Sequence, residues 1–141
     1  LEYMIENDIP EMAKKAGEYF GAGLAELEKK HPTIGFIGGA GMFWQVELVR
    51  DRETREAFIP DDRATRFGGD NSDFPVRIIL GKCLEKGVLL GGFLPNTLRI
   101  GASLTVSKED MDKALDALDN AFQLSLGKAG FVIHVWSLHK F

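Results

Sequence analysis

Cysteine is almost absent from this sequence, because Cys83 is the only one in a chain of 141 residues. A single cysteine excludes an intrachain disulfide, and the lack of a disulfide framework favours a reducing, cytoplasmic setting. We interpret Cys83 as a small core residue and not as a nucleophile. No apolar run is long enough to cross a membrane, and the acidic first residues do not resemble a signal peptide, so we expect no membrane partner.

An excess of basic charge is also missing, since 17 Lys and Arg stand against 21 Asp and Glu, for a net charge of -4. This balance gives no electrostatic reason to expect nucleic acid as a partner. With 45% hydrophobic and 27% charged residues, the composition is that of a globular chain, and the length suits one domain around one core. The chain begins at Leu1 and not at methionine, which we interpret as a sign of a partial chain.

Motifs that cradle phosphate are missing as well, although glycines cluster in residues 35–41. Neither G-x-G-x-x-G nor G-x-x-x-x-G-K-[ST] occurs, and this cluster precedes an expected strand, whereas phosphate-binding glycines follow a strand and open a helix. We predict instead a glycine bend that brings two backbones close together. Side chains alternate along residues 42–49, and this period of two predicts a strand with one exposed face.

A long amphipathic helix of about twenty residues is expected near the beginning of the chain. Its apolar residues recur at helical spacing: Ile9, Met12, Ala16, Phe20, Leu24 and Leu27. Asp8 and Glu11 have the spacing of a capping box, and Pro32 closes the helix. Each glycine inside this helix costs on the order of 1 kcal/mol relative to alanine. Close packing against another element or another domain would offset that cost at Gly17, Gly21 and Gly23.

The stretch from Arg50 to Pro75 is polar, mixed in charge and without a sustained period. A loop this long is unusual in a compact domain, and such loops tend to be functional, disordered or laid against another surface. Acids neighbour its arginines, so we favour a solvated face over an anion site for Arg50, Arg52, Arg55, Arg63 and Arg66.

The second half of the chain predicts a helix, two strands and a helix. The first of these helices carries the apolar stripe Val76, Ile79, Leu80, Cys83 and Leu84, and Gly87 would cap it. Two short strands should follow, near 88–91 and 97–101. Ser107 and Asp110 form a capping box for a last helix. This order predicts an α/β (α+β) fold, in which a small antiparallel sheet of about three to four strands is covered by helices.

One arginine lies within the apolar strand expected at 97–101. Leu98 and Ile100 face one side of this strand, so Arg99 must face the other side, with the small neighbours Thr97 and Gly101. One interpretation is a surface arginine whose aliphatic stem covers the open side of the sheet. The other is a binding residue for an anion such as a carboxylate, which the planar guanidinium contacts at two points.

Several segments of the chain resemble a known family. The segments HPTIGFIGGAGMFWQVELV, KCLEKGVLL and NTLRIGASLTVSKEDMDKALDALDNAF resemble the C-terminal small domain of class III pyridoxal-phosphate (PLP) aminotransferases, the group of ornithine, acetylornithine and 4-aminobutyrate aminotransferases. The resemblance covers about residues 5–125. It implies the fold of the C-terminal domain of fold-type I PLP enzymes for residues 1–126, followed by a tail, 127–141, of unknown role.

This resemblance also implies a function for the complete enzyme, which would move an amino group from an amino donor to a keto acid. Arg99 lies where many members bind a substrate carboxylate, within the motif that appears here as Leu98–Leu104. Two family prolines of that motif are replaced by Ala102 and Ser103, and Gly38 stands where arginine is common, which leaves the subfamily and substrate open. PLP and its Schiff-base lysine would belong to a large domain that precedes this one, and none of the ten lysines here matches that lysine.

We therefore expect no catalytic, cofactor-binding or metal-binding residue in this chain, which would be inactive alone. The glycines of the first helix and the long polar loop would mark surfaces toward the missing large domain or toward a partner in a homodimer. The spacing of His134 and His139 argues against a metal site in the tail. Two alternatives remain open, a stand-alone α/β module that binds a small ligand and an oligomerisation module without catalysis.

Overall fold

The computed structural model describes residues 1–59, 74–93 and 95–125. Their helices and strands follow in the order α1 (Glu2–Glu6), α2 (Ile9–Lys30), β1 (Ile34–Ala40), β2 (Phe43–Asp51), β3 (Glu56–Ala57), α3 (Pro75–Glu85), β4 (Gly91–Phe93), β5 (Thr97–Gly101) and α4 (Lys108–Ser125). The expected tail, 127–141, lies outside the described residues, as do Arg63, Arg66, His134 and His139.

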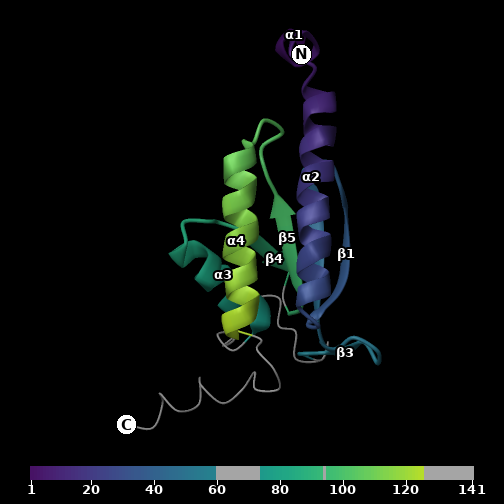
Figure 1. The fold of residues 1–141 in the computed structure, drawn as a ribbon, viewed down its shortest axis with the longest axis vertical. Coiled ribbons are helices and arrows are strands. Elements are labelled where there is room, and N and C mark those ends of the chain that lie inside the picture. Colours follow the sequence, from purple (N-terminus) through teal and green to yellow (C-terminus); the bar gives the residue numbers. More distant parts are fainter. Residues whose placement is uncertain (60–73, 94, 126–141) are drawn as a thin grey trace.

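The sheet has the strand order β1-β2-β5-β4, with every neighbouring pair antiparallel, and the short β3 pairs with the end of β2. Helices α2, α3 and α4 lie together on one face of this sheet (Figure 1). The fold expected from the sequence, a small antiparallel sheet covered by helices, is therefore confirmed.

Alternation along the two central strands separates the faces of the sheet. Val46 and Leu48 of β2 and Leu98 and Ile100 of β5 are buried beneath the helices. The residues between them point to the opposite face, which we call the open face. The alternation seen in the sequence thus places the core side chains on one face of the sheet and exposes the side chains of the other face.

The glycines of α2 let this helix approach its own domain closely. A Cβ at Gly17 would lie 2.3 Å from the carbonyl oxygen of Gly41, and a Cβ at Gly21 would lie 2.5 Å from the Trp44 ring. A Cβ at Gly23 would lie 2.3 Å from Leu115 of α4. Close packing against another element is confirmed, and the expectation that these glycines face a missing domain is wrong.

Several local expectations differ from the structure. Met12, expected in the apolar stripe of α2, is 47% exposed. Most of the glycine cluster forms a strand, β1, that the sequence did not predict, while the expected glycine bend that brings two backbones together lies at Gly41, with a φ of +53°, beside Gly17. Asp8 adopts a φ of 47° and makes no side-chain cap, so the first capping box is wrong. The strand expected near 88–91 is Gly91–Phe93, and Leu84 is 59% exposed.

Arg50, Arg52 and Arg55 are exposed, as expected of a solvated face, and each of them also donates to backbone carbonyl oxygens. Arg52 donates to the carbonyl oxygens of Glu28, His31 and Ile34 at 2.7, 2.8 and 3.0 Å. It thereby satisfies carbonyls at the end of α2 that have no helical partner. Arg55 donates to the carbonyl oxygen of a β1 glycine at 2.9 Å. These contacts, which sequence spacing does not predict, tie the end of β2 to the start of the sheet.

The start of α4 and the end of α3 follow the sequence closely. The Asp110 amide donates to Ser107 Oγ at 3.0 Å, and the Ser107 hydroxyl donates to the Asp110 carboxylate at 2.7 Å, so this capping interaction is confirmed. Gly87 has a φ of +76°, as expected of a residue that ends a helix.

Candidate functional site

The residue singled out by the sequence, Arg99, lies near the centre of the open face. In register across the sheet, Gly38 of β1 lies opposite Gln45 of β2, Gln45 opposite Arg99 of β5, and Arg99 opposite Gly91 of β4. Antiparallel partners share a face, so two long polar side chains lie side by side with a glycine beyond each of them. The expectation that Arg99 points away from the helices is confirmed by its exposure.

An aromatic ring lies against the Arg99 guanidinium. Arg99 Cζ is over the ring of Phe43, 5.0 Å from its centroid. Sequence reasoning missed Phe43, although its position in the alternating strand placed it on the same face as Arg99. A ring face attracts a cation, so this contact favours a charged guanidinium held at the sheet surface.

Glu47 also points to the open face, where it lies opposite Thr97 of β5. Its carboxylate forms an ion pair with Arg55. This acidic side chain therefore has a cationic partner of its own.

Five of the eight described lysines form ion pairs with carboxylates. An imine-forming lysine must reach its neutral form, which burial in apolar surroundings favours. Lysines here form ion pairs on the surface instead: Lys15, Lys29, Lys30, Lys82 and Lys108. For Lys108, a hydrogen bond to Asp112 raises the side-chain pKa above the ordinary value of a lysine.

Cys83 is a core residue, as interpreted from the sequence. Its side chain is fully buried in α3, and this burial raises the pKa of the thiol to about 11. The thiolate is the reactive form, so such a thiol is a poor nucleophile. Within the described ranges, no group of three His, Cys, Asp or Glu side chains is arranged to hold a metal ion.

We expect the folded chain to react with iodoacetamide at pH 8 at least about 100-fold more slowly than the chain unfolded in guanidinium. A rise of the thiol pKa from 9.0 to about 11 lowers the thiolate fraction by about that factor, and burial blocks access as well. Mass spectrometry of time points would measure both rates. Equal rates would show that Cys83 is accessible and that folding does not raise the pKa of its thiol.

A helix-covered antiparallel sheet with an arginine on its open face defines the class of domain, and comparison with known proteins identifies the family. The chain belongs to the class III aminotransferase family, whose sequence model matches residues 1–122. Among solved structures, an S-selective transaminase from Arthrobacter sp. with alanine bound is 45% identical with a TM-score of 0.83, over 93% of this chain and 28% of that one.

Curated relatives are matched over a similar share of their own length. A protein of Gibberella zeae named aminotransferase is 31% identical over 125 residues, which are 86% of this chain and 23% of that protein. A leucine/methionine racemase of Thermococcus litoralis is 31% identical over 121 residues, or 86% of this chain and 24% of that enzyme. The chain thus spans about a quarter of the length of the curated relatives it matches. In the part that the structure describes, none of the helices is both long and apolar enough to span a membrane.

Proposed function

We propose that residues 1–126 are the C-terminal small domain of a PLP-dependent class III aminotransferase, and that Arg99 binds a substrate carboxylate. The observation that carries the proposal is the place of Arg99 on the open face, beside Gln45 and over the Phe43 ring. A planar, charged guanidinium can contact a carboxylate at two points. When PLP is bound, it supplies the electron sink for amino transfer, and this chain supplies an orienting charge.

The open face also suits a boundary with the rest of the enzyme. Phe36 is 45% exposed and Phe43 is 53% exposed, both on the same side of the sheet as Arg99. Apolar rings that no part of the described domain covers are typical of surfaces that another segment packs against. We propose that the preceding large domain covers part of this face, which brings Arg99 to the edge of the reaction site.

We propose that PLP and the Schiff-base lysine belong to that large domain, so that this chain alone is inactive. The surface ion pairs of the described lysines support the proposal. Incubation of the purified chain with PLP, reduction with borohydride and peptide mass spectrometry test it. We expect no lysine to be labelled stoichiometrically, and stoichiometric labelling of one lysine would contradict the proposal.

Two further properties of the complete enzyme are proposed from family membership, a homodimer and a cytoplasmic location. The role of the tail, 127–141, stays open. The free thiol of Cys83 supports a reducing compartment. Size-exclusion chromatography with light scattering on the complete enzyme would test the dimer.

For the substrates, we propose an amino donor and a keto acid, of which alanine and pyruvate are one pair. The transaminase structure at 45% identity was solved with alanine bound, and its product after amino transfer carries the same carboxylate. A second candidate is amino acid racemisation, because one relative is named a leucine/methionine racemase. Loss of the amino group from labelled alanine only when a keto acid is added would favour transamination.

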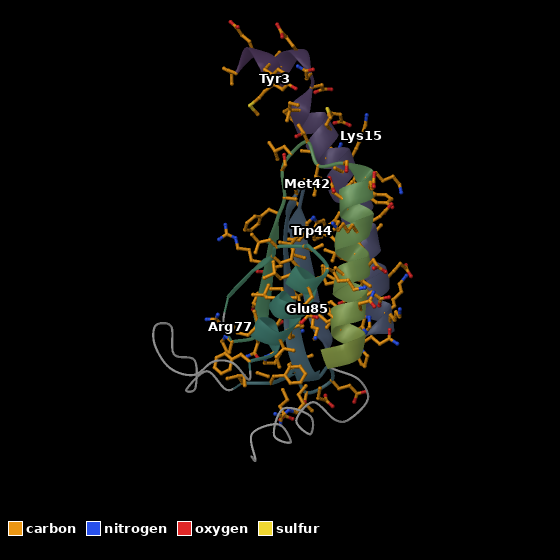
Figure 2. All side chains as sticks on the ribbon, turned by 90° about the vertical axis from the view of Figure 1, so that its left-hand side faces the viewer. Tyr3, Lys15, Met42, Trp44, Arg77 and Glu85 are labelled. Atoms are coloured by element: carbon orange, nitrogen blue, oxygen red, sulfur yellow. The ribbon has the colours of Figure 1, made fainter. Side chains whose placement is uncertain are left out.

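In the complete enzyme, we expect Arg99→Ala to lower kcat/KM for at least one carboxylate substrate more than tenfold, which corresponds to about 1.4 kcal/mol or more of transition-state binding. The physical reason is loss of a two-point, charge-assisted contact. Arg77→Ala is the matched control, because Arg77 is an exposed arginine on α3 (Figure 2). Unchanged kinetics of Arg99→Ala with every carboxylate substrate would rule out the role.

A stand-alone module remains the alternative for this chain. Such a module would bind a small carboxylate without PLP, or it would form a stable oligomer without any ligand. Titration of the chain with pyruvate or alanine, followed by NMR shifts of β5 amides, separates these cases from the proposal. Saturable binding in the micromolar range without PLP would favour the ligand-binding module.

A further inference from the structure

Two exposed phenylalanines on the open face each lie over a glycine. A Cβ at Gly101 would stand 3.7 Å from Cδ2 of Phe43, and a Cβ at Gly38 would stand 2.6 Å from Cε1 of Phe36. The rings share residue type and face and have similar exposure, and Arg99 Cζ lies over the Phe43 ring. This contact makes one of them a candidate partner of the arginine and the other a natural control.

The register of the sheet explains how the Phe43 ring reaches Arg99. Phe43 of β2 lies opposite Gly101 of β5, and Arg99 is two residues away on the same face of β5. Since Gly101 has no side chain, the ring leans across β5, and Arg99 Cζ lies 5.0 Å from its centroid. Side chains at such diagonal positions are within reach of an aromatic ring.

We propose that Phe43 is a positioning residue for Arg99. Its ring meets the guanidinium from the side of the π face, and a contact of this kind does not compete for the N–H groups that bind a carboxylate. The ring restricts the rotamers of a long side chain, so less conformational freedom is lost when a carboxylate binds. This inference rests on the proposed function, in which Arg99 holds that carboxylate.

The kinetic test uses the complete enzyme that carries this chain. We expect Phe43→Leu to raise KM for the carboxylate substrate that depends on Arg99 about two- to fivefold, with kcat nearly unchanged, because an exposed cation–π contact is worth about that factor. Phe43→Tyr keeps a ring and should restore the wild-type KM. Phe36→Leu removes a ring of similar exposure from the same proposed domain boundary, so it measures the effect of losing apolar surface there, and Phe43→Leu should raise KM beyond that effect. An aldehyde acceptor without a carboxylate should be used equally well by all variants.

A second readout needs no activity. In the isolated chain, NMR should show the Arg99 side-chain resonances shifted by the Phe43 ring current. Phe43→Leu should abolish this shift, and Phe36→Leu should preserve it. Because Phe43 is 53% exposed, its replacement by leucine leaves the core intact, which the β5 amide spectrum would verify.

The outcomes separate the two proposals. If Arg99→Ala leaves the use of carboxylates unchanged, the proposed function fails and the kinetic role of Phe43 fails with it, whatever the ring-current shift. If Arg99→Ala raises KM but Phe43→Leu does not, the proposed function stands and the positioning role is overturned. Equal effects of Phe43→Leu and Phe36→Leu would also overturn it, because the effect would then follow loss of apolar surface.

Discussion

Gly17→Ala will lower the free energy of unfolding by at least about 3 kcal/mol, or prevent folding altogether. The added Cβ would stand 2.3 Å from the carbonyl oxygen and 2.5 Å from the Cα of Gly41. Both are backbone atoms, so no side-chain rotation relieves the overlap. Helix α2 would have to move away from the β1–β2 turn, and buried residues such as Phe20 and Leu24 would lose contacts with the sheet.

The chain offers a matched control in Gly81→Ala. Gly81 lies inside α3, and a Cβ there would meet nothing within 4 Å. Alanine is the better helix former, so this variant should gain about 0.5–1 kcal/mol. Urea denaturation followed by circular dichroism would measure both variants. A stability loss at Gly81 as large as that at Gly17 would contradict the prediction, because contact with Gly41 would then not distinguish the two positions.

Asn96→Leu will lower the free energy of unfolding by about 3 kcal/mol, since it leaves two buried backbone groups without partners. Asn96 is 9% exposed. Its side-chain Nδ2 donates to the Ile59 carbonyl oxygen at 2.8 Å, and its side-chain Oδ1 accepts from the Ile59 backbone amide at 3.1 Å. The backbone carbonyl oxygen of Asn96 accepts a hydrogen bond from the backbone amide of Leu48 at 2.8 Å. One side chain thus acts as a strand-like partner for the segment that follows β3.

Two variants make this prediction specific. Asn96→Asp keeps an acceptor but loses the donor at neutral pH, so it should be destabilised at pH 7 and less so at pH 4, where the carboxyl can donate. Asn120→Ala removes an amide that donates within α4 to the Asp116 carbonyl oxygen, and should change stability by less than about 0.5 kcal/mol. Guanidinium denaturation would measure each variant. Equal stability of Asn96→Leu and wild type would show that water satisfies Ile59.

Local periodicity was sufficient to predict part of the fold. The span of α2, the strand at 97–101 and the burial of Cys83 follow from residues that are neighbours along one element. The face of Arg99 follows from the period of a strand alone. These features do not depend on where other elements lie, so they can be predicted from the local sequence.

Features made by distant residues could not be predicted in the same way. Strand β1 is rich in glycine, which has low strand propensity, and packing of Trp44 against Gly39 stabilises it. The role of Asn96 depends on Ile59, 37 residues away. The contact of Phe43 with Arg99 depends on the register between β2 and β5. In each case the decisive neighbour is far away along the chain, and no local pattern names it.

The site around Arg99 on the open face forms only when β2 pairs with β5. Gln45 and Arg99 are opposite each other in this pairing, although the whole of α3 and β4 lies between them in the sequence. The cost of closing such a loop grows by only about 0.6 kcal/mol for each doubling of its length. Insertions between β2 and α3 should therefore cost little stability and leave Arg99 opposite Gln45, because the site depends on this long-range pairing and not on the length of the connection.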